Sequence, residues 1–350
     1  MASIALLGAG IFAREEHLPA IEAAPTLSLK AVYSRSRSSA EALASASRSP
    51  STVAIYFDSP AIPGKSLDDL LQRTDIAAVD VVLPILQQPD VIRKALQAGK
   101  HVLSEKPVAG DVKGARELIA WYGGLQLQQG GRPLWGVAEN WRYMESLRYA
   151  GEKVKEIGGE LVTFSLSKYG SIAVGNKYLE TAWRKTPSHQ GGFLLDGGVH
   201  FVAGLRYLLA AAGDELVQVS GYSTLLDPKL VPVDTVHAAA TTKGGRSGTV
   251  AISFGTAHKN ETELEIVMTK GVVGWNPTEA RIRTGTGEEE KKAFAYSSGV
   301  VAEVAAFAKA IEEGKLKALQ SPEEALGDLL VLQGLLESGA GGAAVTAVGL

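Results

Sequence analysis

The feature that most constrains the fold is a glycine-rich turn directly after the first apolar run of the chain. Residues 3–7 are typical of a buried strand, and Gly8-Ala9-Gly10-Ile11-Phe12-Ala13 follows at once. This pattern matches the G-x-G-x-x-A fingerprint of dinucleotide-binding proteins. Gly8 would permit a tight turn, Gly10 would let the backbone approach a pyrophosphate, and Ala13 would keep the next helix close to the strand. The amino end of that helix would bind the phosphates through unpaired N–H groups.

Behind this turn, β-rich runs alternate with helical patterns up to about residue 138. The strand candidates are Ser3–Leu7, Leu27–Tyr33, Ala78–Leu83, His101–Ser104 and Leu134–Ala138, with helical patterns at Leu67–Leu71, Asp90–Ala98 and Val112–Trp121. Such alternation predicts βαβ units in a parallel, doubly wound sheet. We therefore predict that residues 1–138 form a dinucleotide-binding Rossmann domain.

From residue 139 the pattern changes to runs that often alternate apolar and polar residues, which predicts an antiparallel sheet with one covered face. The expected strands are 160–167, 216–225, 235–242, 247–254, 263–269, 280–284 and 291–296. We predict that residues 139–350 form a second α/β domain, which binds the substrate. A broad sheet of this kind often leaves one face for a partner subunit, so we expect a homodimer or a higher homo-oligomer.

Composition excludes several classes of function. The 350 residues include 35 Lys and Arg against 38 Asp and Glu and contain no long basic run, so we expect no nucleic-acid partner. We also expect no membrane partner, because no apolar stretch reaches the length needed to span a bilayer. The absence of cysteine excludes disulfides, thiolate metal sites and cysteine nucleophiles, and it is compatible with the cytoplasmic location that we predict.

The end of the second strand indicates which dinucleotide binds. An NAD-preferring protein usually has an Asp or Glu there, which repels a 2′-phosphate. This chain instead has Ser34, Arg35, Ser36 and Arg37, and we expect no acid in reach. Guanidinium and hydroxyl groups are suited to a phosphate, and charge-assisted hydrogen bonds contribute about 1.5–3 kcal/mol each. The sequence therefore predicts NADP(H); the alternative is that both arginines are merely solvated at the start of a helix.

The tripeptide Glu105-Lys106-Pro107 ends the apolar run His101–Ser104. It places a cationic, proton-donating side chain at the carboxyl edge of the predicted sheet, where ligands of such sheets bind. A lysine at this edge can exchange a proton with a carbonyl or an alcohol while a nicotinamide exchanges the hydride.

A second polar pair lies in the segment Gly191–His200. If Asp196 begins a helix, Asp196 and His200 are four positions apart on one face, a spacing that suits a carboxylate orienting an imidazole. The alternative is a helix-terminal acid next to a packed histidine. We expect His17 to cap or pack the first helix and the other histidines to be structural. No histidine pair has metal-ligand spacing with a carboxylate, so we predict no metal.

These motifs together resemble the glucose-fructose oxidoreductase/inositol dehydrogenase (Gfo/Idh/MocA) family over nearly the full length. The resemblance rests on Gly8-Ala9-Gly10, Ala95–Pro107, Trp183-Arg184 and Gly191–His200. It implies a Rossmann domain followed by an α/β domain with a large, open, mostly antiparallel sheet, through which oligomers commonly form. It also implies that Lys106, Asp196 and His200 meet at the nicotinamide and that the Lys-Pro bond is often cis.

Within the family, the chain is most similar to a fungal subgroup of cytoplasmic NADP(H)-dependent oxidoreductases. This likeness rests on Gly10–Arg14, His17-Leu18-Pro19, Val137–Trp141 and Asn176–His200. Many family members have Thr-Pro-Asn and a histidine after the fourth strand. This chain has Leu83-Pro84-Ile85 and Gln88 instead, so recognition of an inositol-like polyol is not carried over.

The sequence thus predicts an NADP(H)-dependent oxidoreductase that acts on a small carbonyl or alcohol, with Lys106, Asp196 and His200 as catalytic residues. Tyr178, Trp183 and His200 are candidates for substrate contact. The residues expected to contact the cofactor are Gly8, Gly10, Ile11, Phe12, Ser34, Arg35, Arg37, Leu83, Pro84, Glu105, Lys106, Asn140, Trp183 and Arg184. Two alternatives stay open: a reductase of a C=N or unsaturated-diol substrate, and a non-catalytic NADP-sensing regulator.

Overall fold

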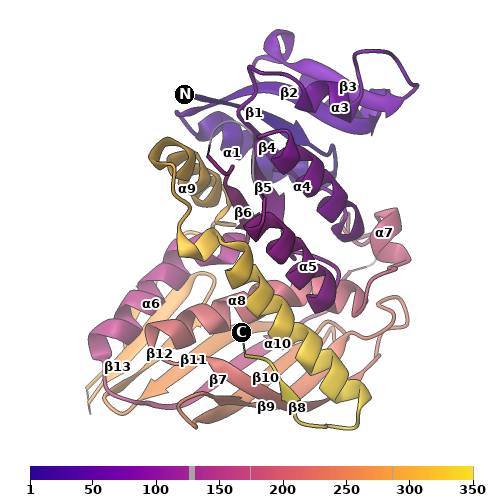
Figure 1. Ribbon diagram of the computed structural model, residues 1–350. Coiled ribbons are helices and arrows are strands. Elements are labelled where there is room, and N and C mark those ends of the chain that lie inside the picture. Colours follow the sequence, from indigo (N-terminus) through magenta and orange to yellow (C-terminus); the bar gives the residue numbers. More distant parts are fainter. Residues whose placement is uncertain (126–130, 174, 286, 350) are drawn as a thin grey trace. The chain divides into compact units, whose positions relative to one another are not determined.

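The chain divides into two compact units, each with its own sheet. The computed structural model describes residues 1–350 except 126–130, 174, 286 and 350. The first unit comprises Met1–Glu139 and Val300–Ala325, and the second comprises Asn140–Gly299 and Leu326–Leu350. The sequence-based division assigned 300–325 to the second domain, whereas the structure places this segment in the first unit (Figure 1).

The first unit is built on a parallel sheet, as the βα alternation predicted. Its described strands have the order β3-β2-β1-β4-β5-β6, and every neighbouring pair is parallel. Their bounds are β1 Ala2–Leu7, β2 Leu27–Ser36, β3 Ala54–Ser59, β4 Ala78–Val81, β5 His101–Glu105 and β6 Trp135–Ala138. The order reverses at β1 and β4, which makes the carboxyl ends of these strands the expected ligand-binding edge.

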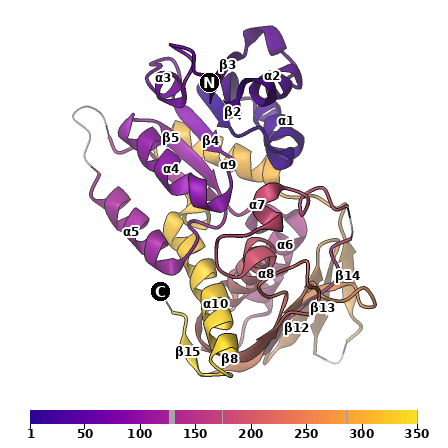
Figure 2. The same cartoon turned by 90° about the vertical axis from the view of Figure 1, so that its right-hand side faces the viewer.

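Helices cover both faces of this sheet. Figure 2 shows the strands between α4 and α5 on one side and α1 and α2 on the other. The helical segments are η1 Ala13–His17, α1 Leu18–Ala23, α2 Arg37–Ser45, η2 Pro50–Thr52, α3 Leu67–Leu71, η3 Ile85–Gln87, α4 Gln88–Gln97, α5 Val112–Gly123, α9 Val300–Glu313 and η5 Ala318–Gln320.

Helix α9 belongs to the first unit because its apolar face completes that unit's core. Val304 and Phe307 are fully buried in the same cluster as Ile4, Leu6 and Leu103 of the central strands. A 14-residue helix with this face would otherwise expose several large apolar side chains to water. No local pattern in the sequence indicates which sheet such a helix covers.

The second unit contains a large, mostly antiparallel sheet, which confirms the predicted fold class. The order of its described strands is β14-β13-β12-β11-β7-β10-β9-β8-β15, and among their pairings only β10 with β7 is parallel. Their bounds are β7 Leu161–Tyr169, β8 Leu216–Thr224, β9 Thr235–Thr242, β10 Ser247–Ser253, β11 Glu261–Met268, β12 Gly271–Asn276, β13 Glu279–Thr284, β14 Glu290–Ala293 and β15 Thr346–Ala347. Strands β12 and β15 were not predicted.

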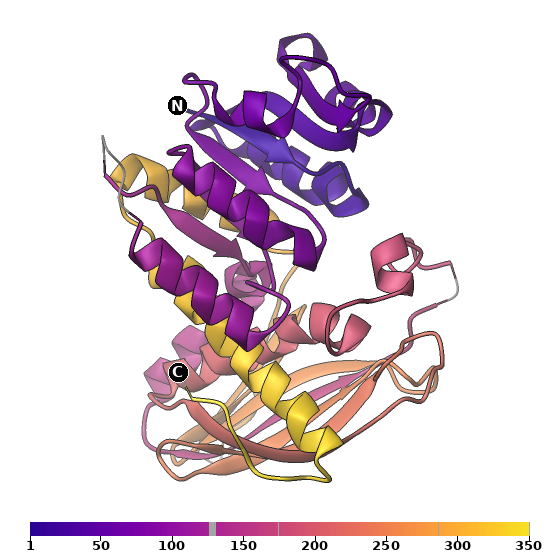
Figure 3. The same ribbon diagram turned by 45° about the vertical axis from the view of Figure 1, so that its right-hand side comes forward.

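Helices pack on one face of this sheet. Among the described residues, Figure 3 shows helices on a single side of the broad sheet. They are η4 Asn140–Tyr143, α6 Glu145–Ile157, α7 Ala182–Lys185, α8 Gly192–Ala211 and α10 Pro322–Ala340, whose residues from Leu326 belong to this unit. Leu264 and Ile266 of β11 are fully buried on the helix side, while Glu263 and Glu265, which alternate with them, face the other way.

Helix α8 corrects one expectation from the sequence. By length and composition it is apolar enough to cross a bilayer, although we expected no stretch of that length. However, 67% of its apolar window is buried inside the protein, and Leu195, Val199 and Val202 are nearly or fully inaccessible to solvent. This is the burial of a core helix, so its hydropathy is explained by packing against the sheet.

A buried ionic network joins three helical segments of the second unit. The Asp328 carboxylate of α10 accepts hydrogen bonds from Arg142 Nη2 of η4 at 2.5 and 2.7 Å and from Arg206 Nη1 of α8 at 2.6 Å. Arg142 and Asp328 are each 1% exposed. Because isolated buried charges are very costly, this network fixes η4 and α8 against one another.

Candidate functional site

The glycine-rich turn has the geometry that the fingerprint requires. Gly8 follows β1 with a φ of +117°, and a Cβ at this position would lie only 2.1 Å from the Val82 carbonyl oxygen, so only glycine fits. A Cβ at Gly10 would meet nothing within 4 Å. The backbone at Gly10 therefore borders open space, where a pyrophosphate could approach it. Ile11 and Phe12 begin the helical segment that continues into η1.

The carboxyl end of β2 carries the residues predicted to select the dinucleotide. Ser34 and Arg35 are among the last three residues of β2, which ends at Ser36, and Arg37 is the first residue of α2. Ser36 caps α2 by accepting a hydrogen bond from the Ser39 N–H at 3.3 Å. Both arginines are exposed, and Arg37 Nε donates to Glu41 at 2.7 Å. Two guanidinium groups thus flank the start of one helix.

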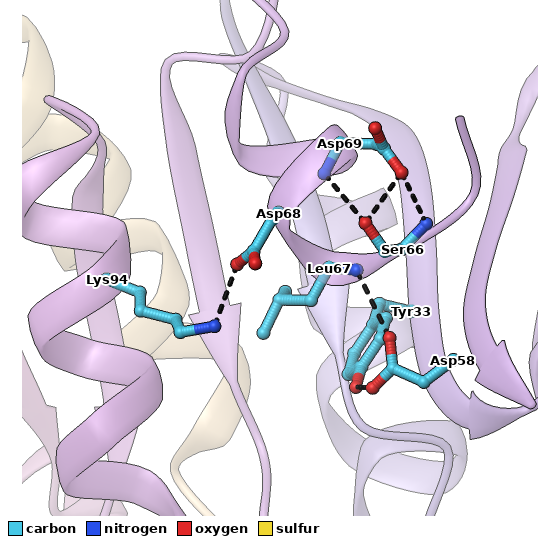
Figure 4. Close-up of polar contacts among 7 residues, drawn as sticks. All are labelled: Tyr33, Asp58, Ser66, Leu67, Asp68, Asp69 and Lys94. Atoms are coloured by element: carbon cyan, nitrogen blue, oxygen red, sulfur yellow. Dashed lines mark hydrogen bonds and ion pairs between the residues drawn. The ribbon is translucent and has the colours of Figure 1, made fainter. Parts of the chain in front are cut away.

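Tertiary structure also brings an acid to this end of β2. Asp58 lies on β3, whose register places it beside Arg35, between the pairs Ser34–Phe57 and Ser36–Ser59. Figure 4 shows its carboxylate held by the Tyr33 hydroxyl and the Leu67 N–H. The expectation that no acid lies in reach is therefore wrong for the folded chain. Burial, reinforced by Asp58, raises the pKa of the Tyr33 phenol, so Tyr33 stays a proton donor to this carboxylate.

The short helix α3 beside Asp58 is fixed by its own polar contacts. Ser66 and Asp69 form a capping box, in which the Ser66 side chain accepts from the Asp69 N–H and Asp69 accepts from the Ser66 N–H. Hydrogen bonds from Ser66 lower the pKa of Asp69, and Asp68 pairs with Lys94 of α4 at 2.8 Å (Figure 4). The loop around Asp58 is therefore held in one arrangement.

Lys106 follows β5 directly, at the carboxyl edge of the parallel sheet. Lys106 is only 9% exposed, and the Lys106-Pro107 peptide bond is cis, as the resemblance implied. Leu83 and Pro84 lie at the same edge, between β4 and η3. The sheet thus gathers Leu83, Pro84 and Lys106 where a ligand of a doubly wound fold is expected.

Glu105 makes a contact that the sequence did not reveal. Its Oε1 lies 2.9 Å from His17 Nε2, and His17 Nδ1 lies 2.7 Å from Asp80 Oδ2 on the neighbouring strand β4. His17 is fully buried and packs edge-on against Phe12, as one of the two predicted roles requires, but its side chain does not cap α1. Burial lowers the pKa of His17, but the two carboxylates outweigh this effect and raise it well above its usual value.

In the second unit, Asp196 and His200 lie one turn apart on α8. The helix begins at Gly192, so Asp196 belongs to its second turn and neither begins the helix nor acts as a first-turn acid. The Asp196 carboxylate accepts a hydrogen bond from Arg184 Nε at 2.7 Å, and Asp196 is 5% exposed. The predicted spacing is present, and the structure adds Arg184 as a charged partner of Asp196.

Arg184 also gathers the aromatic candidates for substrate contact. Its guanidinium carbon lies 4.0 Å from the centre of the Trp183 ring and 5.7 Å from that of Tyr178. Cation–π contacts of this kind contribute about 0.5–2 kcal/mol each. Tyr178, Trp183, Arg184 and Asp196 therefore form one connected group, although they come from α8 and from the segment before it.

His200 stacks on an aromatic ring that sequence reasoning had not singled out. The Trp141 and His200 rings are nearly parallel, with 5.8 Å between their centres and an interplanar angle of 14°. The adjacent Asn140 donates from Nδ2 to the Ser298 carbonyl at 2.5 Å. The available signal for Trp141 was the segment Val137–Trp141, which carried part of the fungal resemblance.

Other histidines have structural contacts, and no metal cluster is present in the described part of the chain. His101 Nδ1 accepts from the Leu134 N–H at 2.9 Å, and His189 Nε2 lies 3.1 Å from the Gly192 carbonyl oxygen. Burial lowers the pKa of both imidazoles. Over these residues, no group of three or more His, Cys, Asp or Glu is arranged to hold a metal ion.

Comparisons with known proteins agree with this architecture. The oxidoreductase family with an NAD-binding Rossmann fold matches residues 2–124, and the GFO/IDH/MocA C-terminal domain matches residues 159–274. A protein of Fusarium mangiferae, Dehydrogenase FPY6, is 55% identical over 344 residues, which are 97% of each chain. An uncharacterized protein of Saccharomyces cerevisiae is 35% identical over 211 residues, 60% of this chain and 56% of the yeast protein.

Solved structures lead to the same family. An oxidoreductase from Thermotoga maritima has a TM-score of 0.84 at 29% identity, and the match covers 99% of this chain and 98% of that one. Both units thus have counterparts in one known protein, in the same order along the chain. The chain belongs to the Gfo/Idh/MocA family of oxidoreductases.

Proposed function

We propose that this protein is an NADP(H)-dependent oxidoreductase that transfers a hydride between the nicotinamide and a small, sugar-like carbonyl or alcohol. The observation that carries the proposal is the position of Lys106 directly after β5, at the carboxyl edge of the parallel sheet of an oxidoreductase. A lysine at this edge supplies a proton donor where the doubly wound fold binds its ligand.

The residues of the first unit fit a dinucleotide. The open space at Gly10 suits a pyrophosphate, and the N–H groups at the start of the next helix suit its negative charge. We assign Gly8, Gly10, Ile11, Phe12, Leu83, Pro84, Glu105, Lys106, Asn140, Trp183 and Arg184 to cofactor contact. When bound, the cofactor supplies the hydride, or accepts it, at C4 of the nicotinamide.

The choice of NADP(H) over NAD(H) is supported by Ser34, Arg35 and Arg37. Both guanidinium groups are exposed at the end of β2, where the 2′ position of the ribose binds in this fold. Asp58 lies nearby, but its carboxylate accepts from the Tyr33 hydroxyl and the Leu67 N–H. The Asp58 carboxylate is thus already paired with Tyr33 and Leu67, which favours the arginines as the groups that meet a 2′-phosphate.

We assign the proton transfer to Lys106 and His200, with Asp196 as the carboxylate that supports them. Reduction of a carbonyl requires a proton at its oxygen, and oxidation of an alcohol requires its removal, so one acid–base group serves both directions. Asp196, on α8, pairs with the Arg184 guanidinium at 2.7 Å. Tyr178 and Trp183, which contact Arg184, are assigned to the substrate.

The test is a substrate panel combined with Lys106→Ala. Purified protein is mixed with NADPH or NADH and with aldehydes, ketoses, imines and unsaturated diols, and oxidation of the reduced nicotinamide is followed by absorbance. We expect turnover of a carbonyl compound with NADPH. Lys106→Ala is expected to lower kcat by about 10²–10⁴-fold, the usual contribution of general acid–base catalysis, while the Kd of NADPH stays within a few-fold.

The exposed Lys113 provides the matched control, because Lys113→Ala removes a lysine that pairs only loosely with Glu117 at 3.9 Å. Turnover by Lys106→Ala that equals the wild type would remove Lys106 from the chemistry. Binding of NADPH without oxidation by any compound would favour the NADP-sensing alternative. Activity confined to imines or diols would favour the second enzymatic alternative.

We further propose a homodimer or higher homo-oligomer formed through the sheet of the second unit. The face opposite the helices carries small and polar side chains, among them Ser165, Thr249 and Ala251. Such a flat surface suits a second copy of the same sheet. The cytoplasmic location stays a prediction from the sequence.

A further inference from the structure

A buried ionisable cluster lies beneath the carboxyl ends of β4 and β5, and the proposed chemistry has not used it. Its centre is His17, which is fully buried with one carboxylate at each ring nitrogen: Asp80 at 2.7 Å and Glu105 at 2.9 Å. A carboxylate only accepts hydrogen bonds, so each ring nitrogen must donate. His17 is therefore an imidazolium that bridges two anions.

Two further buried carboxyl groups belong to this unit, and one of them, Glu303, interacts electrostatically with His17. Glu303 of α9 is fully buried, and neither of its carboxyl oxygens has a hydrogen-bond partner among the described residues. Glu139, at the end of β6, is also buried and interacts electrostatically with Glu303. Burial, followed by the charge of Glu105, raises the pKa of Glu303 well above its usual value.

Such a cluster is a poor way to stabilise a core. Each buried ion loses its hydration, and apolar side chains of the same volume would often stabilise the fold equally well or better. Buried groups with strongly shifted pKa values concentrate at functional sites instead. The positions of the cluster's members indicate which function they support.

The imidazolium connects three elements of the cofactor-binding edge. His17 ends η1, the π-helical segment that follows the glycine-rich turn, and Asp80 lies in β4. Glu105 is the last residue of β5 and directly precedes Lys106 in the chain. The Glu105 side chain is therefore anchored to His17, and the residue that follows it at the edge of the sheet is Lys106.

We propose that His17 is a positioning residue, which holds the Glu105 carboxylate and so fixes the end of β5 that presents Lys106. The proposal rests on the function proposed above for Lys106. Loss of the anchor would leave the last peptide of β5 free to shift, and a displacement of about 1 Å at a reacting group lowers turnover by about 100-fold.

The first test needs no turnover. Lysines are reductively methylated with ¹³C, and the Lys106 resonance is assigned by its absence from Lys106→Arg. We expect His17→Gln and Glu105→Gln each to shift or broaden this resonance. The matched control is His101→Gln, because His101 is also a partly buried histidine, accepts from the Leu134 N–H and lies at the opposite end of β5. It should leave the Lys106 resonance in place.

The second test is a double-mutant cycle on turnover. If His17 acts through Glu105, His17→Gln and Glu105→Gln each lower kcat by about 10–100-fold, and the double variant loses no more than the worse single variant. KM and the Kd of NADPH should change only a few-fold. Additive losses in kcat, or an unchanged Lys106 resonance in both single variants, would overturn the proposal.

The two tests separate this inference from the proposed function. If no substrate is turned over but the Lys106 resonance responds to His17→Gln, the positioning role stands and the enzymatic proposal fails. If Lys106→Ala abolishes turnover while neither His17→Gln nor Glu105→Gln affects kcat or the resonance, the enzymatic proposal stands and the positioning role of His17 fails. Should His17→Gln fail to fold, Glu105→Ala removes the same contact from the other side, and its effects on the Lys106 resonance and on kcat decide the proposal without the cycle.

Discussion

Individual residues in this protein take their roles from partners that are far away in the chain. His17 contacts Asp80, 63 positions on, and Glu105, 88 positions on. In the sequence it resembles any histidine of a first helix, and it becomes an imidazolium only because folding places a carboxylate at each ring nitrogen. By contrast, Gly8 is identifiable from the sequence alone, because its role depends on a local turn that excludes a side chain.

The first prediction concerns the arginines at the end of β2. Arg35→Ala combined with Arg37→Ala should raise the Kd of NADPH by about one to three orders of magnitude and change that of NADH little, because one or two charge-assisted bonds to the 2′-phosphate are lost. Both constants can be measured by nicotinamide fluorescence. Arg48→Ala, which removes another exposed arginine of the same unit, is the control. Equal losses for both cofactors would contradict the assignment.

At the scale of elements, the spacing of apolar residues along the chain predicted most of the helices and strands. Helix α3 spans Leu67–Leu71 as predicted, and β9 spans Thr235–Thr242 as predicted. Strand β12 was missed because glycines at 271 and 274 lower its intrinsic β propensity. Backbone pairing with β11 on one side and β13 on the other stabilises it in the folded protein. The sequence did not indicate that helix α9 belongs to the first unit, because no local pattern shows which sheet its apolar face covers.

The second prediction concerns Glu303 of α9 and the pH dependence of stability. Its pKa in the folded protein is raised above 4.5, so its favourable contribution is complete below that pH and is lost as pH rises towards the folded pKa. Glu303→Gln removes this loss. We expect the variant to gain stability over the wild type as pH increases, by about 1.4 kcal/mol for each pH unit between the two pKa values.

Urea unfolding at a series of pH values measures this difference. Glu312→Gln, an exposed substitution on the same helix, is the control and should show almost no pH-dependent gain. If the free energy of unfolding of Glu303→Gln differs from that of the wild type by the same amount at every pH from about 4 to about 8, folding does not raise the pKa of Glu303 and the prediction fails.

At the scale of the whole molecule, each of the two units has its own sheet and its own proposed role. The parallel sheet gathers the cofactor candidates at one edge, as its topology requires. The large sheet of the second unit has helices on one face, and its other face offers small side chains in register, such as Ala251 between Ser167 and His237. The division of labour was predictable, but the contribution of 300–325 to the first unit was not.

The third prediction tests that open face. Ala251→Arg introduces a long charged side chain on a central strand, while the neighbouring Val250 and Ile252 point into the core and stay unchanged. If oligomers form through this face, the variant should be a monomer by light scattering at concentrations where the wild type is an oligomer, with an unchanged circular dichroism spectrum. Glu312→Arg, on α9 of the first unit, should leave the assembly intact. An oligomeric Ala251→Arg variant would exclude this face as the interface.

Local patterns in the sequence predicted the fold class, the family and most of the elements, because glycine-rich turns and hydrophobic periods act within a few residues. Only the tertiary structure decided which charges meet: His17 with Asp80 and Glu105, Arg184 with Asp196, and Asp58 with the end of β2. These contacts depend on strand order, register and helix packing. Their energy comes from burial and from charge at close range, and neither quantity is defined until distant segments have packed together.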